Sequence, residues 1–185
     1  MHPTATVIVE TPLGPLECSV RDRDGRLVSD GATLRVVSCN GVPRRIDVGA
    51  YDVIGVLLSL SPSQDLEGLS FSCSWINSAV APGEPDNGEW VDAQYWEVGD
   101  WVLLIGTEDF DVLSGRLPHC GFREDDYPTL FLPSALEVRI PHVPSGQAST
   151  FHFVIAAGPG SNAEERFSAW AAADLRHEQL LAIAS

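Results

Sequence analysis

Short runs of apolar and β-branched residues, separated by turn residues about every ten positions, fill the first eighty residues. This spacing is typical of short antiparallel strands, because helices repeat their apolar positions every three to four residues. The runs expected to form strands are residues 6–10, 16–20, 26–29, 32–39, 52–60 and 69–76. Residues 1–80 are therefore expected to form a strand-rich half.

Local detail refines three of these segments. The run VIGVLLSL within 52–60 predicts a strand buried on both faces, whereas the alternation in LSFSCSWI predicts one solvent-facing side for 69–76. Asp24-Gly25 favours a type I′ turn, which would make 26–29 the hairpin partner of 16–20. Arg44 and Arg45 are expected in a surface turn beside carboxylates.

Strands are expected again at 136–142 and 150–157, joined by PSGQAS as a hairpin loop. After Gly160 the pattern is ambiguous. The motif SNAE at 161–164 fits a helical capping box, while Phe167, Ala169 and Ala171 alternate as they would in a strand. We favour a strand over 166–173 and then a short helix or an ordered tail, so residues 136–185 are expected to be a strand-rich carboxyl-terminal part.

These elements predict a mainly β fold, a sandwich or barrel-like arrangement that is largely antiparallel and contains little helix. The alternative is an α+β fold with a carboxyl-terminal helix. The chain of 185 residues has no internal repeat and no long linker, so residues 1–185 are expected to form a single domain.

The net charge of the chain excludes two classes of direct partner. Eleven arginines and no lysine stand against 26 carboxylates, which gives a formal net charge of −15. Nucleic acid and anionic membranes both require a basic surface, so neither is expected as a direct partner.

The compartment is inferred from three absences. The amino terminus has no signal-peptide pattern, and the longest apolar run is much shorter than the roughly 18 residues that span a membrane. Cys18, Cys39, Cys73 and Cys120 form no CxxC pair, so buried free thiols are favoured over disulfides. A cytoplasmic location is therefore expected.

Acidic residues are concentrated in one segment. Residues 84–126 hold twelve carboxylates and two arginines, which account for −10 of the net charge, and three of the five tryptophans. Such a mixture suggests a surface that meets a basic, partly apolar partner. The residues predicted to contact this partner are Glu89, Trp90, Asp92, Trp96, Glu97, Glu108, Asp109 and Asp111. Trp75 and Trp101, which have apolar neighbours, are expected in the core.

The sequence predicts no catalytic residue, metal ligand or cofactor. His119, Cys120 and residues 124–126 could supply metal ligands, but no second His or Cys lies at a zinc-site spacing, so a solvated acidic loop is favoured. No Gly-x-Ser-x-Gly motif is present, and no local triad is evident. His142 and His152 are expected to be partly buried, hydrogen-bonded residues near the ends of adjoining strands.

Three segments resemble motifs of small bacterial immunity proteins, which are encoded beside secreted toxins: residues 105–109 (IGTED), 151–156 (FHFVIA) and 170–174 (WAAAD). The resemblance covers the carboxyl-terminal half, although the residue after Trp170 is smaller than that family would lead us to expect. It implies a cytoplasmic protein that blocks a toxin by binding it without catalysis, and it assigns no functional residue.

Two functions follow from these patterns. The first is an acidic binding protein, an immunity protein or inhibitor, that neutralises a basic partner such as a toxin or nuclease. The alternative is a small-ligand-binding protein or hydrolytic enzyme with its site in a β-sandwich or barrel pocket. A deep pocket lined by His142, His152 or a carboxylate would favour the alternative, and a convex acidic face would favour the inhibitor. The sequence sets neither the partner's identity nor the oligomeric state.

Overall fold

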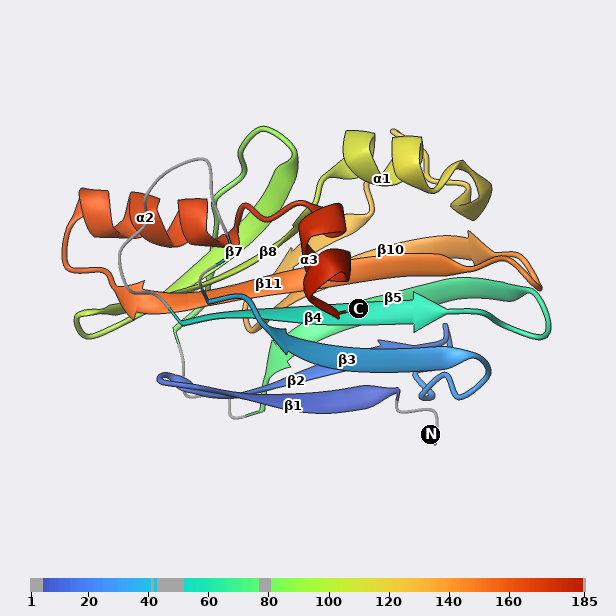
Figure 1. The fold of residues 1–185 in the computed structure, drawn as a ribbon, viewed down its shortest axis with the longest axis horizontal. Coiled ribbons are helices and arrows are strands. Elements are labelled where there is room, and N and C mark those ends of the chain that lie inside the picture. The colour runs from blue at the N-terminus through green and yellow to red at the C-terminus, as the bar shows by residue number, and fades with distance from the viewer. Residues whose placement is uncertain (1–4, 41, 43–51, 77–80, 185) are drawn as a thin grey trace.

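The computed structural model describes residues 5–40, 42, 52–76 and 81–184. Within these ranges the chain is mainly β, as predicted (Figure 1). The strands are β1 (Thr6–Thr11), β2 (Gly14–Arg21), β3 (Ala32–Ser38), β4 (Asp52–Leu60), β5 (Leu66–Trp75), β6 (Glu84–Pro85), β7 (Val91–Val98), β8 (Trp101–Glu108), β9 (Thr129–Leu132), β10 (Ala135–Val143) and β11 (Ser149–Pro159). The helices are α1 (Phe110–Arg116), α2 (Ala163–Ala173) and α3 (His177–Ala184), with a 3₁₀ turn, η1, at Pro118–Cys120. Arg44 and Arg45 lie outside the described residues.

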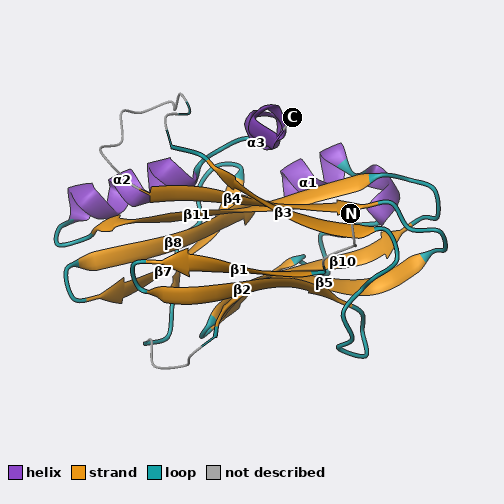
Figure 2. Ribbon diagram, turned by 60° about the horizontal axis from the view of Figure 1, so that its bottom comes forward, coloured by secondary structure: helices purple, strands orange, loops and turns teal. Residues whose placement is uncertain are grey.

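Two antiparallel sheets form a sandwich (Figure 2). The five-stranded sheet has the order β1-β2-β5-β10-β9, and the six-stranded sheet has the order β3-β4-β11-β8-β7-β6. This arrangement confirms the predicted antiparallel β fold and selects the sandwich over the barrel. None of the described helices is long and apolar enough to cross a membrane.

The main core lies between the sheets, because successive side chains on a strand point to opposite faces. Phe71 of β5 meets Phe153 of β11 with ring centroids 4.3 Å apart, and Leu58 and Leu103 are fully buried in the same cluster. Burying each such side chain contributes about 1.5–3 kcal/mol. The inward faces of the two sheets therefore supply the largest share of the apolar burial.

A second core covers the outer face of the six-stranded sheet. Leu57, Leu104 and Val154 point away from the first core and lie in one cluster with residues of α2 and α3. Both helices lie on this side of the sheet (Figure 2). The central strands are thus buried on both faces, as the apolar run in residues 52–60 predicts.

The strand expected at 166–173 is wrong, because these residues belong to α2. Asn162 caps the helix by accepting a hydrogen bond from the Glu165 amide, and the Glu165 carboxylate accepts from the amide and hydroxyl of Ser161. Alanines at 169 and 171–173 are buried, and their small side chains let the helix lie close to the sheet. The capping signal and the helix propensity of alanine therefore outweigh the alternation.

Two smaller expectations also differ from the structure. Residues 26–29 form no hairpin strand but only an isolated bridge between Arg21 and Leu27, and Gly25 alone takes a positive φ in that turn. Trp101 is 45 % exposed at the start of β8 and is not a core residue, whereas Trp75 is buried as predicted. All four cysteines are buried and carry free thiols.

Helix α3 packs against the sheet at a position where the strand has no side chain. A methyl group built on Gly55 of β4 would lie 2.7 Å from Cδ2 of Leu180 and 2.9 Å from Cγ2 of Val37. Both distances are shorter than van der Waals contact, so glycine is what lets Leu180 reach the sheet.

We therefore expect Gly55→Ala to lower the free energy of unfolding by about 1–3 kcal/mol through overpacking. Gly115→Ala in α1 is the matched control, since a methyl group there has nothing within 4 Å. This control should raise stability by about 0.5–1 kcal/mol. Chemical denaturation followed by circular dichroism measures both variants, and equal effects would contradict the proposed close contact.

Candidate functional site

Three elements of the six-stranded layer bring Glu108, His152 and His177 together. Glu108 ends β8, His152 lies in the neighbouring β11, and both point to the outer face of the sheet. His177 is the first residue of α3, and the burial of Leu180 holds that helix over the sheet. The cluster therefore depends on how α3 packs on the outer face.

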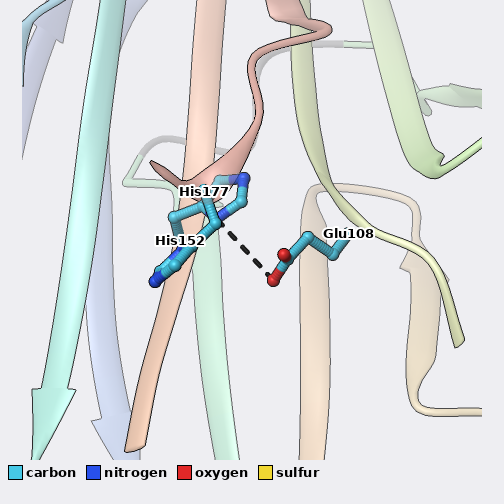
Figure 3. Close-up of side chains that lie close together, drawn as sticks. All are labelled: Glu108, His152 and His177. Atoms are coloured by element: carbon cyan, nitrogen blue, oxygen red, sulfur yellow. Dashed lines mark hydrogen bonds and ion pairs between the residues drawn. The ribbon is translucent and has the colours of Figure 1, made fainter. Parts of the chain in front are cut away.

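The three side chains meet closely. The Nδ1 atoms of His152 and His177 are 2.9 Å apart, and the two rings stack with centroids 5.1 Å apart. Oε2 of Glu108 is 3.8 Å from Nδ1 of His152. One ligand atom from each residue lies within 4.8 Å of the other two. Figure 3 shows the Glu108 carboxylate pointing toward the imidazole rings.

The short separation between the two ring nitrogens limits what lies between them. Two protonated nitrogens would repel each other, and two unprotonated nitrogens would oppose their lone pairs. One proton, donated by one Nδ1 to the other, satisfies the pair, and one metal cation bound by both lone pairs would also satisfy it. The space between the two Nδ1 atoms therefore holds either one proton or one metal cation.

Arg116 of α1 fixes the carboxylate from the opposite side. Its Nε donates to Oε1 of Glu108 at 2.9 Å, and its Nη2 donates to Oε2. The same guanidinium donates to the carbonyl of Thr150, whose hydroxyl lies 2.7 Å from Nε2 of His177. The Glu108–Arg116 pair is largely buried, so removal of either partner would leave an uncompensated charge inside the protein.

The two histidines are uncharged at neutral pH. Burial lowers the pKa of His152 to about 3, and the nearby positive charge of Arg116 acts in the same direction. Burial also lowers the pKa of His177 to about 4, with smaller lowering contributions from His152 and Arg116, while Glu108 and Glu178 act to raise it. Unprotonated imidazoles are the form that binds metal ions.

A pocket of about 310 Å³ opens onto the cluster. Glu108, Arg116, His152 and His177 form its polar wall. Its apolar wall consists of Trp90, Val91, Val112, Ala173 and Leu175, and Thr107, Asp174, Arg176 and Glu178 complete the lining. This combination of apolar walls and a few converging polar groups is typical of small-molecule sites.

The backbone at the edge of this pocket is strained. Among the described residues, Trp90 is the one non-glycine residue with a positive φ, 74°. Such a conformation costs on the order of 1–3 kcal/mol in a bulky residue. The Trp90 side chain is nevertheless 53 % exposed, so its burial does little to offset this cost.

The structure places the predicted partner-binding residues in different environments. Asp92, Trp96 and Glu108 are 2 %, 1 % and 6 % exposed, so they do not present a surface to a docking protein. Asp92 lies near Tyr127, whose hydroxyl donates to its Oδ1 at 3.2 Å, and burial raises the pKa of Asp92. Nε1 of Trp96 donates to the carbonyl of Pro133.

The predicted partner-binding residues that are accessible to solvent do not all lie on one surface. Glu97 lies at the opposite end of β7 from Glu89 and pairs with Arg166 of α2. Asp109 caps α1 by accepting from the Val112 amide, and Asp111 is exposed in the first turn of that helix. Glu89, Trp90, Asp109 and Asp111 therefore share the pocket end of the molecule, while Glu97 does not.

Sequence reasoning identified only part of the cluster. His142 is half-buried and its Nδ1 lies 2.7 Å from Oε1 of Glu67, as predicted. The expectation that His142 and His152 lie on adjoining strands is wrong, because β10 and β11 belong to different sheets and the chain crosses between the layers after Val143. His152 is fully buried, and Glu108 was assigned to a partner surface. His177 carried no sequence signal, because its contact with His152 arises from the docking of α3 and not from local spacing.

Comparison with protein-family models and with curated proteins finds no match for this chain.

The low histidine pKa values predict acid sensitivity. The unfolded chain binds protons at both histidines below pH 6.5, while the folded protein does not until about pH 4 for His177 and pH 3 for His152. Stability should therefore fall as the pH drops from 6.5 toward 4, by about 1.4 kcal/mol per pH unit for each proton. Urea denaturation at a series of pH values measures this slope. His177→Gln should reduce the slope by one proton, and an equal reduction in His142→Gln would contradict the assignment.

Proposed function

We propose that this protein binds a divalent transition-metal ion through Glu108, His152 and His177, and that the pocket beside the ion admits a small molecule. The observation that carries this proposal is the convergence of three ligand atoms within 4.8 Å at the edge of a pocket. The proposal corresponds to the pocket-based alternative among the two functions that the sequence suggests.

The donor set matches a particular class of ion. Two imidazole nitrogens and one carboxylate suit zinc, iron(II) and related metals, whereas calcium and magnesium prefer sites made of oxygen atoms alone. Two nitrogens that each lie ~2.1 Å from one ion are ~3.0–3.4 Å apart in octahedral or tetrahedral geometry. The 2.9 Å separation of the Nδ1 atoms is close to this range.

The surroundings of the ligands also support metal binding. Thr150 contacts Nε2 of His177, the second ring nitrogen, as the outer partner of a metal-bound histidine commonly does. Arg116 donates to both oxygens of Glu108, so it competes with a metal ion for this third ligand.

Three protein ligands leave a coordination position that a small molecule or water can take. Zinc sites with two histidines and one glutamate support hydrolysis, and iron sites with the same ligands support oxygen chemistry. The open side of this cluster faces the pocket, so a hydrolytic role is the simplest extension of metal binding.

Isothermal titration with Zn²⁺ in excess Mg²⁺ tests the proposal. We expect one site per chain that Mg²⁺ does not occupy, and Co²⁺ should give visible absorption typical of nitrogen and oxygen ligation. His177→Ala should weaken Zn²⁺ binding at least tenfold, because one of three ligands is lost. His142→Ala, a histidine outside the cluster, should leave affinity unchanged.

Weaker Zn²⁺ binding in His177→Ala could also result from misfolding. A second variant, which is expected to respond more strongly to Zn²⁺ than the parent protein, separates these two explanations. Arg116→Gln removes the cation that competes for Glu108 and leaves that carboxylate unpaired inside the protein. The variant should be less stable without metal and should gain more in melting temperature from Zn²⁺ than the parent protein does. Equal Zn²⁺ responses in both proteins, or the same Zn²⁺ affinity in His177→Ala, would argue against the site.

A second candidate function is binding of a basic protein, with the immunity or inhibitor role that the sequence suggests. One observation favours it: Phe110 and Tyr127 lie in contact, with ring centroids 6.2 Å apart, which brings α1 beside the acidic turn at 123–126. Exposed carboxylates and the half-exposed Tyr127 and Trp90 thus share one end of the molecule. Carboxylates of this kind would speed the encounter with a cationic partner.

Charge reversal at the exposed acids tests this second candidate. A partner recovered by pull-down at low salt should associate more slowly, at least tenfold, with Asp111→Arg/Asp126→Arg than with the parent protein. Glu97→Arg/Asp100→Arg, at the far end of the β7–β8 hairpin, is the matched control and should have a much smaller effect. Equal effects of both sets in surface-plasmon-resonance kinetics would mean that net charge, and not this surface, controls binding.

A further inference from the structure

We infer that Trp90 is the platform of a small-molecule site, and that the pocket takes a small organic molecule with a flat ring and no negative charge. The inference shares its pocket with the proposed metal centre but does not require the metal. It stands on the strained backbone of Trp90, the exposure of its indole and the composition of the pocket walls.

The backbone at Trp90 favours a different residue. Glu89 and Trp90 are the central pair of a tight turn closed by the hydrogen bond from the Gly88 amide to the Val91 carbonyl. A positive φ at the second central position is usually supplied by glycine or asparagine, because a larger side chain crowds its own backbone there. The chain places its largest residue type at this position instead.

Packing within the fold does not account for this choice. Trp96 and Trp170 each donate their indole N–H to a backbone carbonyl, and Trp75 lies against Trp96 with centroids 5.9 Å apart. The ring contacts found among the described residues do not include Trp90, and 53 % of the residue is exposed. Trp90 is the one described tryptophan that lines this pocket, and about half of its surface is open to a ligand.

Two backbone hydrogen bonds hold the Trp90 main chain in place. The Trp90 carbonyl accepts a hydrogen bond of 3.1 Å from the amide of Asp109. Asp109 is the N-cap of α1, so Trp90 is tied both to the turn and to the helix that carries Arg116. A platform fixed in this way loses little conformational freedom when a ligand stacks on it.

The size and charge of the pocket define the ligand. A volume of about 310 Å³ fits a molecule of one or two rings. Three carboxylates (Glu108, Asp174, Glu178) and two guanidinium groups (Arg116, Arg176) line the pocket, and Arg116 is already paired with Glu108. The face of an indole ring attracts cations and stacks on flat rings. Without a bound metal, a negatively charged ligand is disfavoured by the local charge and by the net charge of −15.

Three probes that share one ring and differ in charge test the inference: benzylamine, benzyl alcohol and benzoate. Binding to the full chain is measured by chemical-shift changes in ¹⁵N NMR spectra, with the indole N–H of Trp90 assigned by substitution. We expect benzylamine and benzyl alcohol to bind at the pocket and benzoate to bind at least tenfold more weakly. Benzoate binding as tightly as benzylamine would overturn the charge assignment, and the absence of binding by all three probes would overturn the site.

Two glycine variants separate a ligand role from a structural one. Trp90→Gly relieves the positive φ, so it should fold with a melting temperature close to that of the parent protein and should lose benzylamine binding about tenfold or more. Trp101→Gly removes a similarly exposed tryptophan from a regular strand, so it should lower the melting temperature and retain binding. Unchanged affinity in Trp90→Gly would overturn the inference. The probe affinities are measured in EDTA, on protein without metal. Failure of the proposed Zn²⁺ site would therefore not change them, and the two proposals can fail separately.

Discussion

Burial of the six-stranded sheet on both faces is the constraint on which the rest of the structure depends. Its inner face meets the second sheet, and its outer face must be covered by something else. Helices α2 and α3 provide that cover, and they can approach closely because α2 buries alanines and because Gly55 leaves room for Leu180. The same cover turns the ends of β8 and β11 from solvent-exposed positions into an enclosed site.

Polar groups inside such a cover must be paired, because an unpaired charge or hydrogen-bonding group away from water is costly. The pocket meets this requirement with the Glu108–Arg116 pair and with the facing nitrogens of His152 and His177. Buried ion pairs are weak contributors to stability compared with apolar side chains of the same volume. A function for these groups is therefore a better explanation of their presence than stability, and the facing nitrogens of the two histidines leave room for one cation between them.

The two candidate functions use the same end of the molecule in different ways. The proposed metal ligands line the pocket, while exposed acids and aromatic rings lie at the same end of the molecule. The buried members of the acidic segment serve the fold: Asp92 lies between the sheets, and Glu108 belongs to the polar cluster. Trp90 belongs to both regions, because it lines the pocket and is also exposed beside the acids. Its positive φ is an unfavourable backbone conformation for a residue that lies outside the core.

Local patterns were sufficient to determine the fold class. Alternation with a period of two, turn residues and the doubly buried run in 52–60 each reflect neighbours within a few positions. They predict a mainly antiparallel β fold correctly, and the tertiary structure selects the sandwich over the barrel. At 166–173 the alternation led to a strand, which is wrong, because the capping signal and the helix propensity of alanine outweigh the alternation and the helix packs against the sheet. The site depended entirely on tertiary structure. His177 reaches His152 because α3 crosses the outer face, and Asp92 and Trp96 are buried because the second sheet lies beneath them. Contacts between residues far apart in the chain follow from how the layers pack, which no local pattern encodes.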